Sequence, residues 1–215
     1  MTEQTADEMF AAGVDFITSG NHIWDKREFR GYLDETDRVI RPANYPPGSP
    51  GRGSGVIDVE GVRVGVLNVM GRVFMPTVDD PFRCAREQVD MLRDQTHVIV
   101  VDVHAEATSE KMAMARYLDG SVSFVYGSHT HVQTADEQIL GGGTAYITDV
   151  GMTGPSDGVI GMETAGVLQR FTQAYGERFS VQKTCARQFC AVLATVEVQS
   201  GRALDVKRIN LRGLA

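Results

Sequence analysis

The chain has 215 residues and a formal net charge of −7, with 42% hydrophobic and 23% charged residues. These values are ordinary for a globular protein and predict a single domain spanning residues 1–215. The acidic balance argues against duplex nucleic acid as a partner, because that partner needs a basic surface, but it leaves small phosphorylated substrates open.

Apolar spacing and turn-forming residues predict the elements of the first half of the chain. Helices are expected at 5–12, with Gly13 as C-cap, and at 24–33 and 81–94. Strands are expected at 14–18, 55–59 and 62–69, with a hairpin turn at Glu60-Gly61 between the last two. Four prolines and four glycines predict an ordered loop over 41–55.

The second half of the chain is predicted in the same way. Helices are expected at 109–118, with Ser109 as N-cap, and at 164–174. Strands are expected at 97–103, 121–126, 144–148, 191–198 and 203–210. Strands alternate with helices over the first two thirds and β-rich segments follow, which favours an α/β layered sheet whose loops carry the site.

No apolar run approaches the roughly 20 residues of a transmembrane helix, so no membrane contact is expected. The three cysteines, Cys84, Cys185 and Cys190, form no CxxC pair. An odd number of cysteines and no recognisable secretory leader predict reduced thiols and a cytoplasmic protein. Metal ligation by Cys185 and Cys190 is the less favoured interpretation, because neither falls in a known zinc spacing.

Four of the five histidines lie in three short loops, and each loop follows an apolar run that predicts a strand. The loops are Ser19-Gly20-Asn21-His22, Val103-His104-Ala105-Glu106 and Gly127-Ser128-His129-Thr130-His131. Neutral imidazoles and an amide oxygen that converge on one rim of a sheet form a site for a borderline divalent metal such as Mn, Fe, Co or Zn. A metal-assisted hydrolase is therefore the leading hypothesis.

Each motif also has a plainer interpretation. The His129–His131 pair is compatible with two polar loop residues, and His104 with a hydrogen-bonded core residue. Glu106 and Glu110 are candidates for orienting an imidazole or for solvated charges, and solvated charge is favoured for Glu110. His97 has no companion and is interpreted as structural or surface.

The three histidine loops resemble consecutive motifs of the calcineurin-like binuclear metallophosphoesterases. Longer stretches, at 41–46, 68–75, 102–111 and 148–155, resemble the bacterial YmdB-like branch, whose members hydrolyse cyclic nucleotides. The resemblance covers nearly the whole chain. It implies the layered αββα sandwich of these enzymes, in an α/β fold.

The resemblance also implies roles for individual residues. Asn21, His104 and His129 would hold one metal ion, His131 would belong to a second, and His22 would protonate the leaving group. The ions would be Fe, Mn, Mg or Zn, and a metal-bound hydroxide would attack the phosphorus in line. The implied substrates are small phosphodiesters, above all 2′,3′-cyclic nucleotides, with 3′,5′-cyclic nucleotides as a second candidate.

Three loops are expected to wall the substrate pocket, at 44–45, 71–74 and 152–155. The candidate substrate contacts within them are Asn44, Tyr45, Arg72, Phe74 and Thr153. Arg72 is the best candidate for a cation that faces phosphate, and a structural salt bridge is an equally strong interpretation.

The chain departs from the family pattern at its start. The strand–helix–strand that carries the GDxxG and Glu-Asn motifs of the family is not found, and neither Glu3 nor Asp7 sits at a strand end. Those motifs supply ligands to the second metal and the bridging position, so one metal is expected here, together with a weakened second site. A fragment or misassigned start is favoured over a chain completed by another polypeptide or a variant without binuclear activity.

Two other functions are weighed against the phosphodiesterase. One is a non-catalytic or weakly active regulator of the same fold that binds a nucleotide or a protein partner. The other is a protein phosphatase, for which nothing in the sequence identifies a groove. A homo-oligomer is compatible with any of these functions.

Overall fold

The computed structural model describes residues 1–173, 175–176, 178–183 and 186–214. Its helices are α1 (Glu3–Ala11), α2 (Phe29–Glu35), α3 (Pro81–Arg93), α4 (Thr108–Leu118) and α5 (Thr164–Thr172). Its strands are β1 (Ser54–Val59), β2 (Val62–Met70), β3 (Val98–His104), β4 (Phe124–Ser128), β5 (Gln138–Ile139), β6 (Ala145–Ile147), β7 (Gly154–Pro155), β8 (Arg187–Val196) and β9 (Ala203–Leu214).

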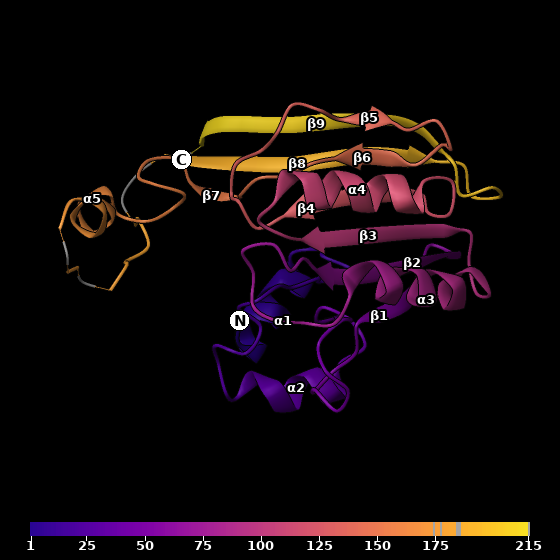
Figure 1. The fold of residues 1–215 in the computed structure, drawn as a ribbon, viewed down its shortest axis with the longest axis horizontal. Coiled ribbons are helices and arrows are strands. Elements are labelled where there is room, and N and C mark those ends of the chain that lie inside the picture. The colour runs from indigo at the N-terminus through magenta and orange to yellow at the C-terminus, as the bar shows by residue number, and fades with distance from the viewer. Residues whose placement is uncertain (174, 177, 184–185, 215) are drawn as a thin grey trace.

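The strands form two sheets (Figure 1). The larger sheet has the order β1-β2-β3-β4-β6-β5, in which β2, β3, β4 and β6 run parallel and the two edge strands run antiparallel. The smaller sheet, β7-β8-β9, is antiparallel. The predicted α/β class is therefore confirmed, with a mixed central sheet.

Alternation along β3 divides the core between the two faces of the larger sheet. Ile99, Val101 and Val103 are buried in one cluster with residues of α3 and α4, which lie over this face in Figure 1. Val100 packs on the opposite face, in a cluster that includes Val192 of β8. By the same alternation, Asp102 and His104 belong to the face away from the helices.

The expected strand at 14–18 is wrong. Ile17 makes a single parallel bridge with Val39, donating through its amide to the carbonyl of Arg38 and accepting from the amide of Ile40. A strand needs a ladder of several paired residues, and here only Ile17 and Val39 pair. The segment is therefore an isolated bridge rather than a strand.

The helix expected at 24–33 begins instead at Phe29. The preceding residues form successive turns, in which Asp25 donates to the His22 carbonyl and Phe29 to the Lys26 carbonyl. Trp24 packs edge-on against Tyr45, with 5.4 Å between ring centroids. The turn conformation allows Trp24 to make this tertiary contact. Tertiary packing therefore overrides the helical spacing of the sequence.

The other expected elements are present, with shifted ends. Glu60 and Gly61 both have positive φ, as a two-residue hairpin turn requires. The expected N-cap at Ser109 is wrong, because α4 begins one residue earlier and Ala107 takes the cap position without a side-chain bond. The expected end of the last helix at residue 174 lies outside the described residues. None of the described helices has the length and apolarity needed to cross a membrane.

Candidate active site

Three of the predicted ligands meet at one edge of the larger sheet. His104 ends β3 and pairs in register with Ser128, the last residue of β4, so His129 follows directly beside it. The Nε2 atom of His104 lies 2.8 Å from Oδ1 of Asn21 and 3.2 Å from Nδ1 of His129. The parallel pairing of β3 and β4 brings His104 and His129 together across 25 residues, and a separate loop brings Asn21 to His104 across 83 residues.

The loop that carries Asn21 can reach His104 because residue 20 is glycine. A Cβ atom at Gly20 would overlap the imidazole ring of His104. The loop is held from behind by Ser19, whose Oγ donates to the carbonyl of Ile40 at 2.8 Å. The Gly-Asn-His sequence thus combines a close backbone approach with a side chain directed at the ring.

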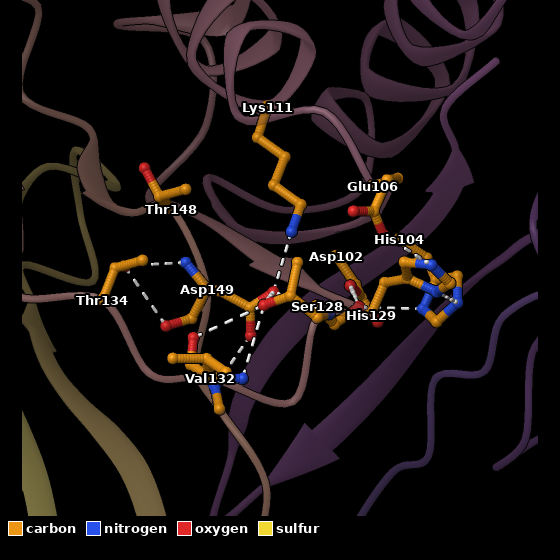
Figure 2. Close-up of polar contacts among 12 residues, drawn as sticks. Asp102, His104, Glu106, Lys111, Ser128, His129, Val132, Thr134, Thr148 and Asp149 are labelled. Atoms are coloured by element: carbon orange, nitrogen blue, oxygen red, sulfur yellow. Dashed lines mark hydrogen bonds and ion pairs between the residues drawn. The ribbon is translucent and has the colours of Figure 1, made fainter. Parts of the chain in front are cut away.

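The turn that carries His129 and His131 is anchored by a buried ion pair (Figure 2). Lys111 of α4 lies 2.8 Å from Asp149, and each side chain is 1% exposed. The same Asp149 oxygen accepts from the amide and the hydroxyl of Thr130. His129 and His131 have φ values of 103° and 65°, which are unfavourable for residues with a Cβ. The anchor at Thr130, between them, holds this conformation.

Burial sets the charge of the two central imidazoles. It lowers the pKa of His104 to about 3 and also lowers the pKa of His129. Both rings are therefore neutral at pH 7, as a metal ligand must be. Glu106 lies with Oε2 3.1 Å from Nε2 of His129 (Figure 2), and an ionised carboxylate only accepts. Nε2 of His129 then carries the proton and Nδ1 keeps its lone pair, so of the two interpretations of Glu106 this contact favours the orientation of an imidazole.

The three converging atoms fit a borderline divalent ion. Two imidazole nitrogens and one amide oxygen are ligand types for Zn, Mn or Fe, and separations of 2.8 and 3.2 Å are those of ligands at roughly 2.1 Å from one ion. Among the described residues, no three His, Cys, Asp or Glu side chains come together in such a group. The amide of Asn21 is thus essential to the set.

His22 and His131 lie outside these contacts. His22 is exposed and has its Nδ1 3.0 Å from Asp25. It shares a cavity of about 180 Å³ with His104, and this cavity is also lined by Met1, Ser19, Gly20 and Ile23. His131 has its Nδ1 3.0 Å from the carbonyl of Ile160 and lines a separate cavity.

Two of the expected substrate contacts, Asn44 and Tyr45, make contacts within the protein. Asn44 is 1% exposed, and its amide bonds the main chain of Met70 on both sides and the carbonyl of Asp79. Tyr45 packs on Trp24. The prediction of a substrate contact for Asn44 is not supported by this geometry, because its hydrogen-bonding groups serve the main chain.

The remaining candidate substrate contacts, Thr153, Arg72 and Phe74, differ in how strongly other residues hold their side chains. The hydroxyl of Thr153 bonds both the amide and the carbonyl of Cys190, so it braces β8. The Nη2 atom of Arg72 is 4.0 Å from Oδ2 of Asp80, and the Arg72 side chain is about half exposed. Phe74 is 90% exposed and has a φ of 61°. Arg72 and Phe74 thus remain open to a ligand.

The interpretation of Glu110 as a solvated charge is wrong. Its side chain is buried, and its carboxylate accepts from the amides of Arg72 and Val73. Gly71 makes this possible, since a Cβ there would overlap the carboxylate. Glu110 therefore fixes the loop that follows β2.

Neither of the two cysteines that the structure describes, Cys84 and Cys190, belongs to the set of converging atoms. Burial raises the pKa of Cys84 to about 11, which keeps it protonated. Cys190 accepts from the side-chain amide of Asn210 at 3.6 Å. Both are free thiols, as predicted, and Cys185 lies outside the described residues.

Sequence reasoning missed the polar residues that support the histidines. Ser128 lies in a histidine motif, and Lys111 and Asp149 lie in the stretches 102–111 and 148–155, but their residue types alone do not indicate burial. One signal was present in Asp102, the only charged residue in an otherwise apolar run. A charge at such a position indicates a buried polar network.

Comparison with known proteins identifies the family. The model of YmdB-like proteins matches residues 1–209. A Bacillus subtilis protein named 2′,3′-cyclic-nucleotide 2′-phosphodiesterase is 44% identical over 209 residues, which is 97% of this chain and 79% of that protein. A crystal structure of a hypothetical protein from Thermus thermophilus matches with a TM-score of 0.92 and 40% identity, covering 99% of this chain and 82% of the other. A crystal structure of a novel phosphatase from Mycoplasma pneumoniae gives 0.90 and 32%, covering 99% and 77%. The chain belongs to the YmdB-like family.

Proposed function

We propose that the protein is a metal-dependent phosphodiesterase that opens 2′,3′-cyclic nucleotides. The observation that carries the proposal is the meeting of Asn21 Oδ1, His104 Nε2 and His129 Nδ1 within 3.2 Å of their neighbours. The name of the Bacillus subtilis relative, a 2′,3′-cyclic-nucleotide 2′-phosphodiesterase, supports the choice of substrate. The acidic net charge is compatible with it, because a bound cation supplies local positive charge that the sequence sum does not count.

The residues divide the work as follows. A divalent ion, when bound, would polarise the phosphoryl group and lower the pKa of a bound water. Asn21, His104 and His129 would hold this ion, and Glu106 would orient His129. In the net reaction water adds across one ester: its oxygen joins phosphorus, the P–O2′ bond breaks and the 2′ oxygen takes a proton. The product is a nucleoside 3′-phosphate.

A direct test measures the product. The purified chain, loaded with Mn²⁺, is expected to convert 2′,3′-cyclic AMP to 3′-AMP, detected by ³¹P NMR, and a chelator is expected to stop the reaction. Comparison with 3′,5′-cyclic AMP tests the second candidate substrate. Absence of turnover with Mn²⁺, Fe²⁺, Zn²⁺ and Mg²⁺ alike would refute the proposal.

His22→Ala is expected to separate acid catalysis from metal binding. His22 lies in the cavity beside His104 but contacts none of the three donors, so metal content should stay unchanged. A general acid contributes about 10²–10⁴-fold, chiefly for poor leaving groups. The variant should therefore lose much more turnover on a nucleoside diester than on a nitrophenyl diester. Equal losses on both substrates would show that His22 is not the acid.

A non-catalytic regulator that binds nucleotide is the second candidate. The observation that favours it is the orientation of His131, whose Nδ1 faces the Ile160 carbonyl rather than the three donors. Calorimetry with 2′,3′-cyclic AMP and the metal-loaded chain distinguishes the two candidates, since binding without product would support the regulator.

A further inference from the structure

Behind His104 lies a continuous run of hydrogen bonds that the reaction itself does not use. Nδ1 of His104 is 3.0 Å from Oγ of Ser128, which donates to Oδ1 of Asp102 at 2.7 Å (Figure 2). The other oxygen of Asp102 accepts from Thr18 at 2.6 Å, and the Thr18 hydroxyl is 3.1 Å from that of Tyr126. The carboxylate is thus bonded on both oxygens and is only 3% exposed.

The direction of these bonds decides where the proton of His104 sits. A serine hydroxyl has one proton, and Ser128 gives it to Asp102. Ser128 therefore presents only lone pairs to His104, so Nδ1 of the ring must be the donor in the 3.0 Å contact. In a neutral imidazole the other nitrogen, Nε2, is then unprotonated.

We propose that Asp102, acting through Ser128, is a positioning residue that fixes His104 as the Nδ1–H tautomer and so directs a lone pair of Nε2 to the metal. The proposal rests on the metal site of the proposed function. The same reasoning applies to His129. Glu106 fixes the tautomer of His129 that has the lone pair on Nδ1.

One physical consequence follows from this assignment. Nε2 of His104 faces Oδ1 of Asn21 at 2.8 Å and Nδ1 of His129 at 3.2 Å, and all three atoms present lone pairs. Three acceptors at these separations without a proton repel one another, and a cation among them removes the repulsion. The network thus prepares the site for a cation before one arrives, as outer hydrogen-bond partners of metal ligands do.

The test begins with the metal-free protein at pH 8. Long-range ¹H–¹⁵N spectra report which nitrogen of each histidine is protonated. For His104 we expect Nδ1 protonated and Nε2 bare, and the reverse pattern overturns the proposal. This measurement does not depend on activity, so it can fail or succeed separately from the phosphodiesterase function.

Variants then test the effect on metal binding. Ser128→Ala is expected to abolish the tautomer preference and to weaken Zn²⁺ binding by about 10–100-fold, and Ser128→Thr, which keeps the hydroxyl, is expected to restore both. Ser123→Ala is the matched control: Ser123 is a buried serine that immediately precedes β4, whereas the half-buried Ser128 ends it, and Ser123 bonds the main chain of Ile99 and His97. Equal Zn²⁺ affinities for Ser128→Ala and Ser123→Ala would overturn the proposal.

A second variant covers the case in which Ser128→Ala does not fold. Asp102→Asn keeps the shape of the side chain and replaces one acceptor oxygen by a donor. It is expected to weaken Zn²⁺ binding by at least about tenfold with an unchanged circular dichroism spectrum. Wild-type affinity in a folded Asp102→Asn protein would contradict the role of the carboxylate.

Discussion

Replacing His104 by alanine is expected to remove the bound metal and to reduce phosphodiesterase turnover to background. The Nε2 atom of His104 takes part in both contacts among the three proposed ligand atoms. Its loss therefore leaves Asn21 and His129 without a common partner. Loss of an outer partner of a ligand already costs about 10–100-fold in metal affinity, and loss of a ligand should cost more. Elemental analysis after dialysis, together with the rate on 2′,3′-cyclic AMP, measures both effects.

His97→Ala is the matched control for this experiment. His97 is exposed and immediately precedes the opposite end of β3, so the same substitution there should change neither metal content nor turnover. If His104→Ala retains metal as well as His97→Ala does, His104 is not a ligand.

Lys111→Met is expected to destabilise the protein by about 3–5 kcal/mol, because it leaves Asp149 as an uncompensated buried charge. It should also lower metal affinity, since Asp149 anchors the turn that carries His129 through Thr130. Urea unfolding measures the change in the free energy of unfolding, and Zn²⁺ titration measures the effect on the site.

Two further variants make this prediction sharp. Lys207→Met removes the same side chain from a pair in which both partners are exposed, and it should have little effect. Adding Asp149→Asn to Lys111→Met removes the unpaired charge and should recover part of the lost stability. Equal stabilities of the Lys111 and Lys207 variants would show that the buried pair is not an anchor.

The local parts of the fold could be predicted from the sequence because their causes are local. Glu60-Gly61 sets its own turn, and Asp80 with Pro81 begins α3 through bonds to nearby amides. The extended segment around Ile17 does not become a strand, because apolar β-branched residues indicate an extended chain but not the length of its partner. Pairing is a tertiary property, which the sequence pattern does not contain.

The candidate site follows the same division. His104 and His129 could be placed together, because the ends of parallel strands share one edge of a sheet. The pairing of Lys111 with Asp149 could not, since it joins residues 38 apart through the interior. The burial of Asn44 could not be predicted from the sequence either, because its hydrogen-bond partners belong to β2 and to the loop before α3. Burial and hydrogen-bond direction arise only when distant segments pack.

The most direct test is a crystal of the protein grown with Mn²⁺ and measured at the manganese absorption edge. An anomalous peak is predicted about 2.0–2.3 Å from Asn21 Oδ1, His104 Nε2 and His129 Nδ1. A fully substituted crystal with no peak there, or with the ion bound elsewhere, would contradict the metal centre from which the proposed chemistry is derived.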